Sequence, residues 1–187
     1  MNDRAKTIIA AIIFLIIGIG IGYTLSYRNI ISNDQNKGES TGIGPAVGTE
    51  LKKEITLITE GGGLKKISEY RGSALLINFW ASWCGPCMIE MPGIFAVQKK
   101  YKKQGLEVLA INLDDNIFTG RLMLEKRIGK PAFPLFQGMN SDILRIFPLE
   151  GIPYTILVDK KGIIRYSEAG EINWLTKENL KKIEDIL

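Results

Sequence analysis

The residues of this sequence that could carry chemistry are two cysteines, Cys84 and Cys87, separated only by Gly85 and Pro86. They directly follow an apolar run that predicts a buried strand, and Pro86 stands where the first turn of a helix is expected. Backbone N–H groups at a helix N-terminus favour a thiolate and lower the pKa of the thiol. We therefore expect Cys84 to be exposed and to attack a disulfide of another protein. Cys87, one turn into the helix, is expected to resolve the mixed disulfide.

Other uses of the two cysteines fit the sequence less well. Histidine is absent, which excludes Ser-His-Asp and Cys-His catalysis and leaves no imidazole to complete a zinc shell begun by two thiolates. One pair of cysteines is too few for the disulfide framework of a small secreted scaffold. A thiol peroxidase needs Pro-x-x-x-Thr/Ser-x-x-Cys, where this sequence has Ile77 and Ala81. We expect no bound metal, and no cofactor other than a redox-active disulfide between Cys84 and Cys87.

Length and composition indicate one folded domain with an appendage. The chain has 187 residues, of which 45% are hydrophobic and 24% charged. The net charge of +4 comes from 24 basic and 20 acidic side chains that are scattered along the chain. Because no long basic stripe could follow a phosphate backbone, nucleic-acid binding is not expected.

The N-terminal segment predicts the compartment. Residues 7–27, between Lys6 and Arg28, are uncharged, and as a helix they would reach about 31 Å, which matches the hydrocarbon thickness of a bilayer. The run is longer than a signal-peptide core and ends without a small-residue cleavage site, so an uncleaved anchor is favoured over a cleaved signal peptide. Residues 1–6 form a short N-terminal tail, expected in the cytoplasm. The protein is then a single-pass protein of the cell membrane, with its catalytic domain on the extracytoplasmic side.

Residues 28–48 are rich in Gly, Ser and Asn and predict a flexible linker, whose span is on the order of 25 Å. Residues 49–187 then form one domain in which strands and helices alternate, so an α/β fold with a mixed sheet is expected. The expected strands are Ile55–Thr59, Leu75–Trp80, Glu107–Leu113, Leu135–Phe136, Tyr154–Val158 and Ile163–Glu168. The expected helical segments begin at Pro86, Thr119, Ser141 and Thr176.

A run of lysines brackets Tyr101 near the end of the first of these helices. Lys99, Lys100, Lys102 and Lys103 would complement the negative end of the helix dipole there. A solvated helix end is the favoured interpretation, and a binding patch is the alternative.

The segment Asn78–Cys87, with sequence NFWASWCGPC, resembles the active-site signature of the thioredoxin superfamily. Three further motifs and the N-terminal anchor narrow the resemblance to TlpA/ResA-like membrane-anchored thiol-disulfide oxidoreductases. These motifs are Glu90-Met91-Pro92, Phe133-Pro134 and the segment Gly151–Thr155. The resemblance implies a thioredoxin-like fold, in which helices flank a central mixed sheet, together with one N-terminal transmembrane helix.

The resemblance also implies roles for residues that contact substrate. Pro153 matches a cis-proline that lies against the disulfide and leaves the backbone of Ile152 free to pair with a substrate strand. Trp83 would cover the sulfurs, and Gly85 and Pro86 would belong to the same substrate-binding surface. Pro92 matches a proline that kinks the active-site helix without ending it.

The acidic residues near the cysteines are assigned by the same resemblance. Glu90 matches an acid that could relay the proton when Cys87 attacks, although an exposed helical glutamate is the alternative. Asp114 or Asp115 would take the place of a second acid. Asn78 stands where thioredoxins carry a buried aspartate, which makes Glu90 the better proton acceptor. Tyr154 replaces the threonine that usually follows the cis-proline, a change expected to alter the substrate groove.

The function implied is the reduction of disulfides in envelope proteins, for example apocytochrome c, by dithiol-disulfide exchange. A membrane thiol electron donor would restore the dithiol. An envelope disulfide oxidant or isomerase is an alternative, because both directions of electron flow occur on this scaffold. A non-enzymatic tethered chaperone, or a Cu(I) carrier that uses the two soft sulfurs, is another.

Overall fold

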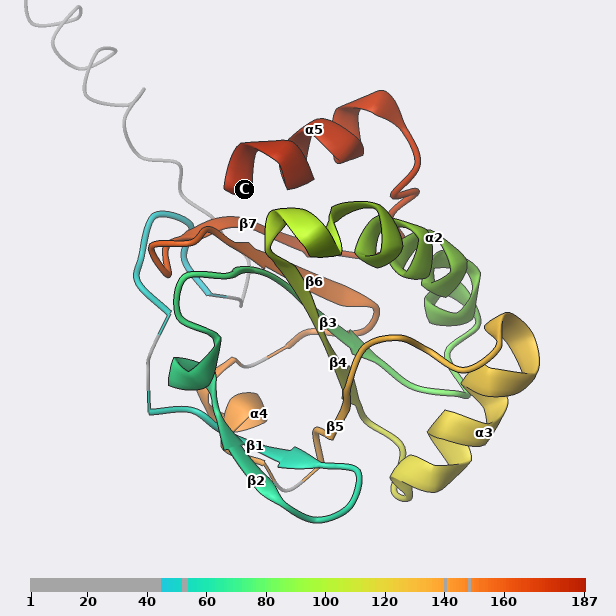
Figure 1. The fold of residues 1–187 in the computed structure, drawn as a ribbon. Helices are drawn as coiled ribbons and strands as arrows, with labels where there is room; N and C mark the ends of the chain where they lie inside the picture. Colours follow the sequence, from blue (N-terminus) through green and yellow to red (C-terminus); the bar gives the residue numbers. More distant parts are fainter. Residues whose placement is uncertain (1–44, 52–53, 140, 148) are drawn as a thin grey trace, which may run out of the picture. The chain divides into compact units, whose positions relative to one another are not determined.

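A computed structural model shows how these elements are arranged (Figure 1). It describes residues 45–51, 54–139, 141–147 and 149–187. The expected tail (1–6), the expected membrane anchor (7–27) and most of the expected linker (28–48) lie outside these residues. Among the helices that are described, none is long and apolar enough to cross a membrane.

A seven-stranded mixed sheet forms the centre of the domain, in the order β2-β1-β5-β4-β3-β6-β7. Strands β3, β4 and β5 are parallel to one another, whereas β6 runs antiparallel to β3 and the outer pairs are also antiparallel. The predicted α/β fold with a mixed sheet is confirmed. The strands are β1 (Thr56–Thr59), β2 (Leu64–Lys66), β3 (Ala74–Trp80), β4 (Leu106–Asn112), β5 (Leu135–Gln137), β6 (Tyr154–Val158) and β7 (Ile164–Ala169).

Among the described strands, β2 is the one that the sequence did not predict. It has three residues, two of them lysines, so it carries no alternating apolar pattern of its own. It forms because it pairs with β1, with Leu64 opposite Ile58. The turn between the two strands contains three consecutive glycines, Gly61 to Gly63, and Gly62 adopts a positive φ of 79° there.

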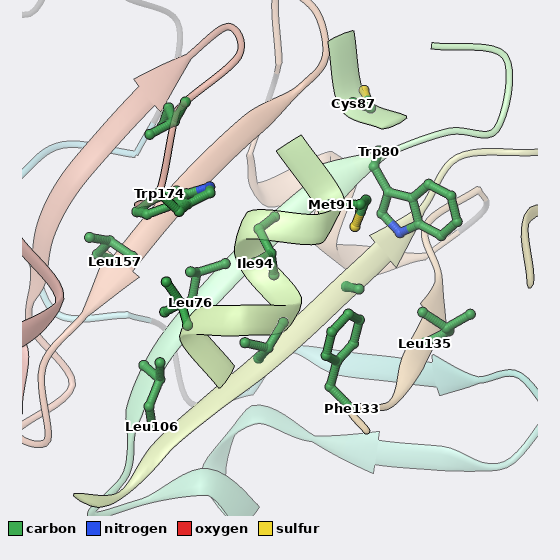
Figure 2. Close-up of a cluster of buried hydrophobic side chains, with 14 of the residues drawn as sticks. Leu76, Trp80, Cys87, Met91, Ile94, Leu106, Phe133, Leu135, Leu157 and Trp174 are labelled. Atoms are coloured by element: carbon green, nitrogen blue, oxygen red, sulfur yellow. The ribbon is translucent and has the colours of Figure 1, made fainter. Parts of the chain in front are cut away.

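The helices are α2 (Gly85–Tyr101), α3 (Ile117–Ile128), α4 (Asp142–Ile146) and α5 (Lys177–Ile186), with two short 3-10 segments at Ile67–Tyr70 and Lys102–Gln104. Figure 1 shows α2 and α5 on one face of the sheet. Alternate residues of β3 supply the two cores: Leu76 and Trp80 pack with Met91 and Ile94 of α2 (Figure 2). The intervening residues, Leu75, Ile77 and Phe79, pack on the opposite face with β1 and α4.

This alternation places one polar side chain among the apolar residues that face α2. Asn78 lies between Leu76 and Trp80 on that side of β3 and is fully buried. A buried amide needs hydrogen-bond partners, and those partners lie in the candidate active site.

Candidate active site

Helix α2 begins at the cysteine pair. Cys84 is the N-cap residue, with an extended backbone, and its sulfur accepts a hydrogen bond from the Cys87 N–H at 3.2 Å. Pro86 lies in the first turn, where its missing N–H has no intrahelical partner to lose. Cys84 and Cys87 are joined by a disulfide. The strand–turn–helix arrangement predicted for this motif is therefore present.

The predicted exposure of Cys84 is wrong for this disulfide form. Cys84 is 6% exposed and Cys87 is fully buried. The Cys84 sulfur is bonded to Cys87 on one side and lies 3.7 Å from the carbonyl oxygen of Ile152 on the other, so only an edge of it reaches solvent. Of the two sulfurs it is still the one that an incoming thiol can reach.

The loop that reaches the disulfide from across the sheet contains a cis peptide bond between Ile152 and Pro153, as the resemblance implies. Pairing of β3 with β6, with Phe79 opposite Tyr154, brings this loop to the carboxyl end of β3, where the cysteines follow. Pro153 is buried and Ile152 is half-buried.

Two hollows border Trp83, whose side chain is 70% exposed. One, of about 650 Å³, is lined by Ser82, Trp83, Leu113, Asp114, Asp115, Asn116, Thr119 and Met139. The other, of about 410 Å³, is more apolar and is lined by Trp83, Leu113, Leu144, Leu149, Glu150, Gly151 and Ile152. Gly85 and Pro86 are exposed beside Trp83. The residues that line the two hollows, together with Gly85 and Pro86, form an open surface around the buried disulfide.

Glu90 lies one turn after Cys87 on α2 and is only 3% exposed, so the alternative of an exposed helical glutamate is wrong. Its Oε1 accepts a hydrogen bond from Asn78 Nδ2 at 2.6 Å, and its Oε2 accepts one from the Ile172 N–H at 3.0 Å. Burial raises the pKa of Glu90 to about 7, although these two hydrogen bonds act in the opposite direction; the negative charge of Glu171 adds to the rise. The carboxyl group can therefore take up or release a proton near neutral pH.

Asn78 holds this carboxyl group in place. Its Nδ2 donates to Glu90 Oε1 and also to Thr155 Oγ1, at 3.0 Å, so it links β3 to α2 and to β6. The amide does not ionise, so Glu90 is the ionisable member of this trio. Sequence reasoning identified Asn78 as a departure from thioredoxins but did not identify this contact.

Of the two adjacent aspartates, Asp114 is the buried one: it is 5% exposed, whereas Asp115 is exposed. The Asp114 carboxylate accepts hydrogen bonds from the Ser82 N–H at 3.1 Å, from Ser82 Oγ at 2.9 Å and from Asn112 Nδ2 at 2.7 Å. Gly120 packs against it: a Cβ there would lie 2.6 Å from Asp114 Oδ2. Asp114 thus fixes the loop that leads to Trp83 and Cys84.

Tyr154, which follows the cis-proline, does not contact the groove as the sequence suggested. Tyr154 is buried at 6% exposure, packs edge-on against Phe79 and hydrogen-bonds Ser167 through its hydroxyl. It lines neither hollow beside Trp83, so the expected change to the groove is not a direct contact.

Helix α2 continues through Pro92 to Tyr101, as expected for a proline that does not end the helix.

Comparison with known proteins identifies the family. The sequence profile of the Redoxin family matches residues 46–186. The chain belongs to the Redoxin family. A thiol-disulfide oxidoreductase ResA from Geobacillus kaustophilus is 31% identical over 185 residues, covering 97% of this chain and 96% of the relative. One from Bacillus cereus (strain ATCC 10987) is 26% identical over 179 residues, covering 96% and 95%.

Solved structures agree with this redoxin assignment. The crystal structure of a thiol:disulfide interchange protein DsbE from Chlorobium tepidum has a TM-score of 0.67 and 26% identity, and the match covers 75% of this chain and 97% of the other. The thioredoxin-like fold and the resemblance to TlpA/ResA-like proteins are confirmed. This redoxin is a ResA-like thiol-disulfide oxidoreductase with a Cys-x-x-Cys pair. Within the part of the chain that the structure describes, no three His, Cys, Asp or Glu side chains are grouped to hold a metal ion.

Proposed function

We propose that this redoxin is a single-pass, membrane-anchored enzyme of the cell envelope that reduces disulfides in extracytoplasmic proteins such as apocytochrome c. The observation that carries the proposal is the position of the Cys84 sulfur, 3.7 Å from the Ile152 carbonyl oxygen and next to cis-Pro153. An extended substrate segment that pairs with the Ile152 backbone would bring its own disulfide against Cys84. Trp83, Gly85 and Pro86 would contact the remainder of that segment.

The exchange proceeds in two displacements. The Cys84 thiolate attacks one sulfur of the substrate disulfide, and the other substrate sulfur leaves as a thiolate. Cys87 then loses its proton and attacks the Cys84 sulfur, which releases the second substrate thiolate and forms the Cys84–Cys87 disulfide. Two electrons pass from the dithiol to the substrate. A membrane thiol electron donor restores the dithiol by the same chemistry in reverse.

Glu90 is proposed as the group that accepts the proton from Cys87. It follows Cys87 by one helical turn, is shielded from water, and has a pKa of about 7, which suits a proton acceptor that works near neutral pH. Trp83, Gly85, Pro86, Ile152 and Pro153 are proposed as substrate contacts rather than participants in proton transfer.

The proposed anchor at residues 7–27 would hold this chemistry at a membrane. Its support is the uncharged 21-residue run and the match to the Geobacillus relative, which covers 97% of this chain and so extends into the N-terminal segment. No peroxidase activity is proposed, because Ala81 and Ile77 replace the residues that a thiol peroxidase needs. No bound cofactor is required for the proposed exchange.

The reduction potential of the Cys84–Cys87 pair, measured by alkylation and mass analysis in thiol redox buffers, tests the direction. A value near or below about −230 mV supports a reductase. A value above about −180 mV would instead indicate an oxidant or isomerase.

A Cys87→Ser variant tests the mechanism. It is expected to trap substrates as mixed disulfides through Cys84, whereas a Cys84→Ser variant is the matched control and should trap none. Equal trapping by both variants would contradict the assigned order of attack.

A further inference from the structure

The end of the sheet opposite the disulfide carries exposed cations from three separate segments. They come from the loop before β3, from the turn after α2 and from the turn between β6 and β7. We call this surface the basic end, and its members are Arg71, Lys102, Lys103, Lys160 and Lys161.

The fold brings these segments together. The Ala74 N–H donates to the Gly105 carbonyl at 3.0 Å, which joins the start of β3 to the turn after α2. Gly105 in turn lies against Lys160: a Cβ on this glycine would be 3.3 Å from Lys160 Cε. Arg71, Lys160 and Lys161 also line one hollow of about 220 Å³, whose rim includes Glu50. Asp159, beside Lys160, is engaged by Arg165 at 2.7 Å.

The basic end is remote from the redox chemistry. It lies at the Ala74 end of β3, whereas the cysteines follow Trp80 at the other end, and seven residues of strand span about 20 Å. A protein that exchanges electrons with Cys84 therefore has no need to contact the basic end.

The basic end is also where the chain enters the domain. The Gly48 N–H donates to the Ile164 carbonyl, and the Leu51 N–H donates to the Gly162 carbonyl, both at 2.8 Å. The segment that arrives from the N-terminal apolar run is thus fixed beside the Lys160–Gly162 turn. The cations of the basic end therefore lie where the tether joins the domain.

We propose that the basic end docks on the anionic phospholipid surface of the membrane that holds the anchor, with Cys84 facing away from it. The proposal rests on the membrane anchor of the proposed function. Lys and Arg side chains are attracted to anionic lipid only within about a Debye length, roughly 8 Å at physiological salt. The tether keeps the domain near the surface at a high effective concentration, so a weak attraction is enough.

Energy transfer from a dye on the protein to an acceptor on the lipid headgroups tests the orientation. The full chain, in its disulfide form, is reconstituted into phosphatidylcholine vesicles with or without phosphatidylglycerol, at low and at high salt. The dye is attached at Gln104→Cys, a neutral exposed position of the basic end, or at Ala169→Cys, which pairs with Tyr154 at the active-site end. Because Cys84 and Cys87 are bonded to each other, only the introduced thiol reacts.

A charge variant and a matched control complete the design. The variant K102Q/K103Q/K160Q removes three charges from the basic end. The control K126Q/R127Q/K130Q removes three exposed charges elsewhere. Of these, Lys126 and Arg127 line a hollow with Ser82 and Met88, near the active site. Transfer from position 104 should rise with phosphatidylglycerol, and this rise should be lost at high salt. The rise should also be lost in the first variant and retained in the second, and transfer from position 169 should show no rise.

Equal transfer with and without phosphatidylglycerol, or an equal rise at both dye positions, would overturn the docking. An acidic protein partner for the basic end would give the first of these results. Protein that does not float with vesicles refutes the anchor and the docking together. Disulfide exchange measured in detergent is expected to be equal in K102Q/K103Q/K160Q and wild type, and an absence of exchange in wild type would refute the redox proposal alone.

Discussion

Two buried carboxyl groups flank the active-site loop, and they differ in what holds them. Glu90, behind Cys87, is 3% exposed and accepts one hydrogen bond at each oxygen, from Asn78 and from the Ile172 N–H. Asp114, beneath the segment before Cys84, is 5% exposed and accepts two hydrogen bonds from Ser82 and one from Asn112. Glu90 is poised to exchange a proton, with a pKa of about 7, whereas Asp114 anchors backbone. Similar burial thus serves two different purposes.

The largest expected effect is on the rate at which Cys87 attacks the mixed disulfide, and it distinguishes Glu90 from Asp114. Glu90→Gln should slow the attack of Cys87 on the mixed disulfide by about 100-fold near neutral pH, because the proton acceptor is gone. Asp114→Asn is the matched control and should change that step by no more than about threefold. Rapid-quench measurement of product release from the Cys84 mixed disulfide checks both. Equal slowing by the two variants would contradict the assignment of Glu90, rather than Asp114, as the proton acceptor.

The second prediction concerns stability and pH. Below about pH 4.5 Glu90 is protonated in both the folded and the unfolded chain. Its contribution to the free energy of unfolding is then at its largest. As pH rises towards 7, the unfolded chain releases this proton first, and the contribution is lost. The free energy of unfolding should fall by about 3 kcal/mol over this range from this residue.

Urea denaturation of the disulfide form at several pH values measures this loss. Glu90→Gln should lack that component of the slope, whereas Asp114→Asn should retain it. A slope that is unchanged in Glu90→Gln would contradict the assignment.

The third prediction tests the packing around Asp114. Gly120→Ala would place a methyl group 2.4 Å from Asn112 Nδ2 and 2.6 Å from Asp114 Oδ2, so both side chains must shift. We expect a loss of about 1 to 2 kcal/mol in the free energy of unfolding, after the better helix propensity of alanine is included. Gly61→Ala, where no atom lies within 4 Å, is the control and should stay within about 0.5 kcal/mol.

The smallest expected effect is that of Asp114→Asn on stability, about 1 kcal/mol, because the amide keeps one acceptor oxygen but turns an N–H₂ group towards other donors. Asp115→Asn, at an exposed position, should have almost no effect in the same thermal or urea denaturation. If the two substitutions cost the same, the Ser82 contacts do not stabilise the loop.

The redox pair could be predicted from the sequence because its signals are local. A buried strand, two cysteines three residues apart and a proline in the first helical turn lie within one short segment. Strand boundaries were also close to those observed, since most strands are apolar runs bounded by glycine or proline. Strand β2 was missed because its existence depends on β1 rather than on its own residues.

The surroundings of the two carboxyl groups could not be predicted in this way. Glu90 accepts its hydrogen bonds from Asn78 and Ile172, which are 12 and 82 residues away in the sequence. Asp114 and Asp115 are adjacent, and only the path of the chain after β4 decides which one turns inward. The Ile152 carbonyl that lies 3.7 Å from the Cys84 sulfur is 68 residues away in the sequence.

The hydrogen bond from the Ile172 N–H to Glu90 has a consequence for the C-terminal part of the chain. Ile172 lies on the segment that connects β7 to helix α5, so the carboxyl group that follows Cys87 also holds the approach to the last helix. An ionised carboxylate accepts a stronger hydrogen bond than a neutral carboxyl group. Protection of this one amide hydrogen from solvent exchange is therefore expected to be greater when Glu90 is ionised than when it is protonated. Amide exchange at Ile172 can thus report the average protonation state of Glu90 without modifying either sulfur.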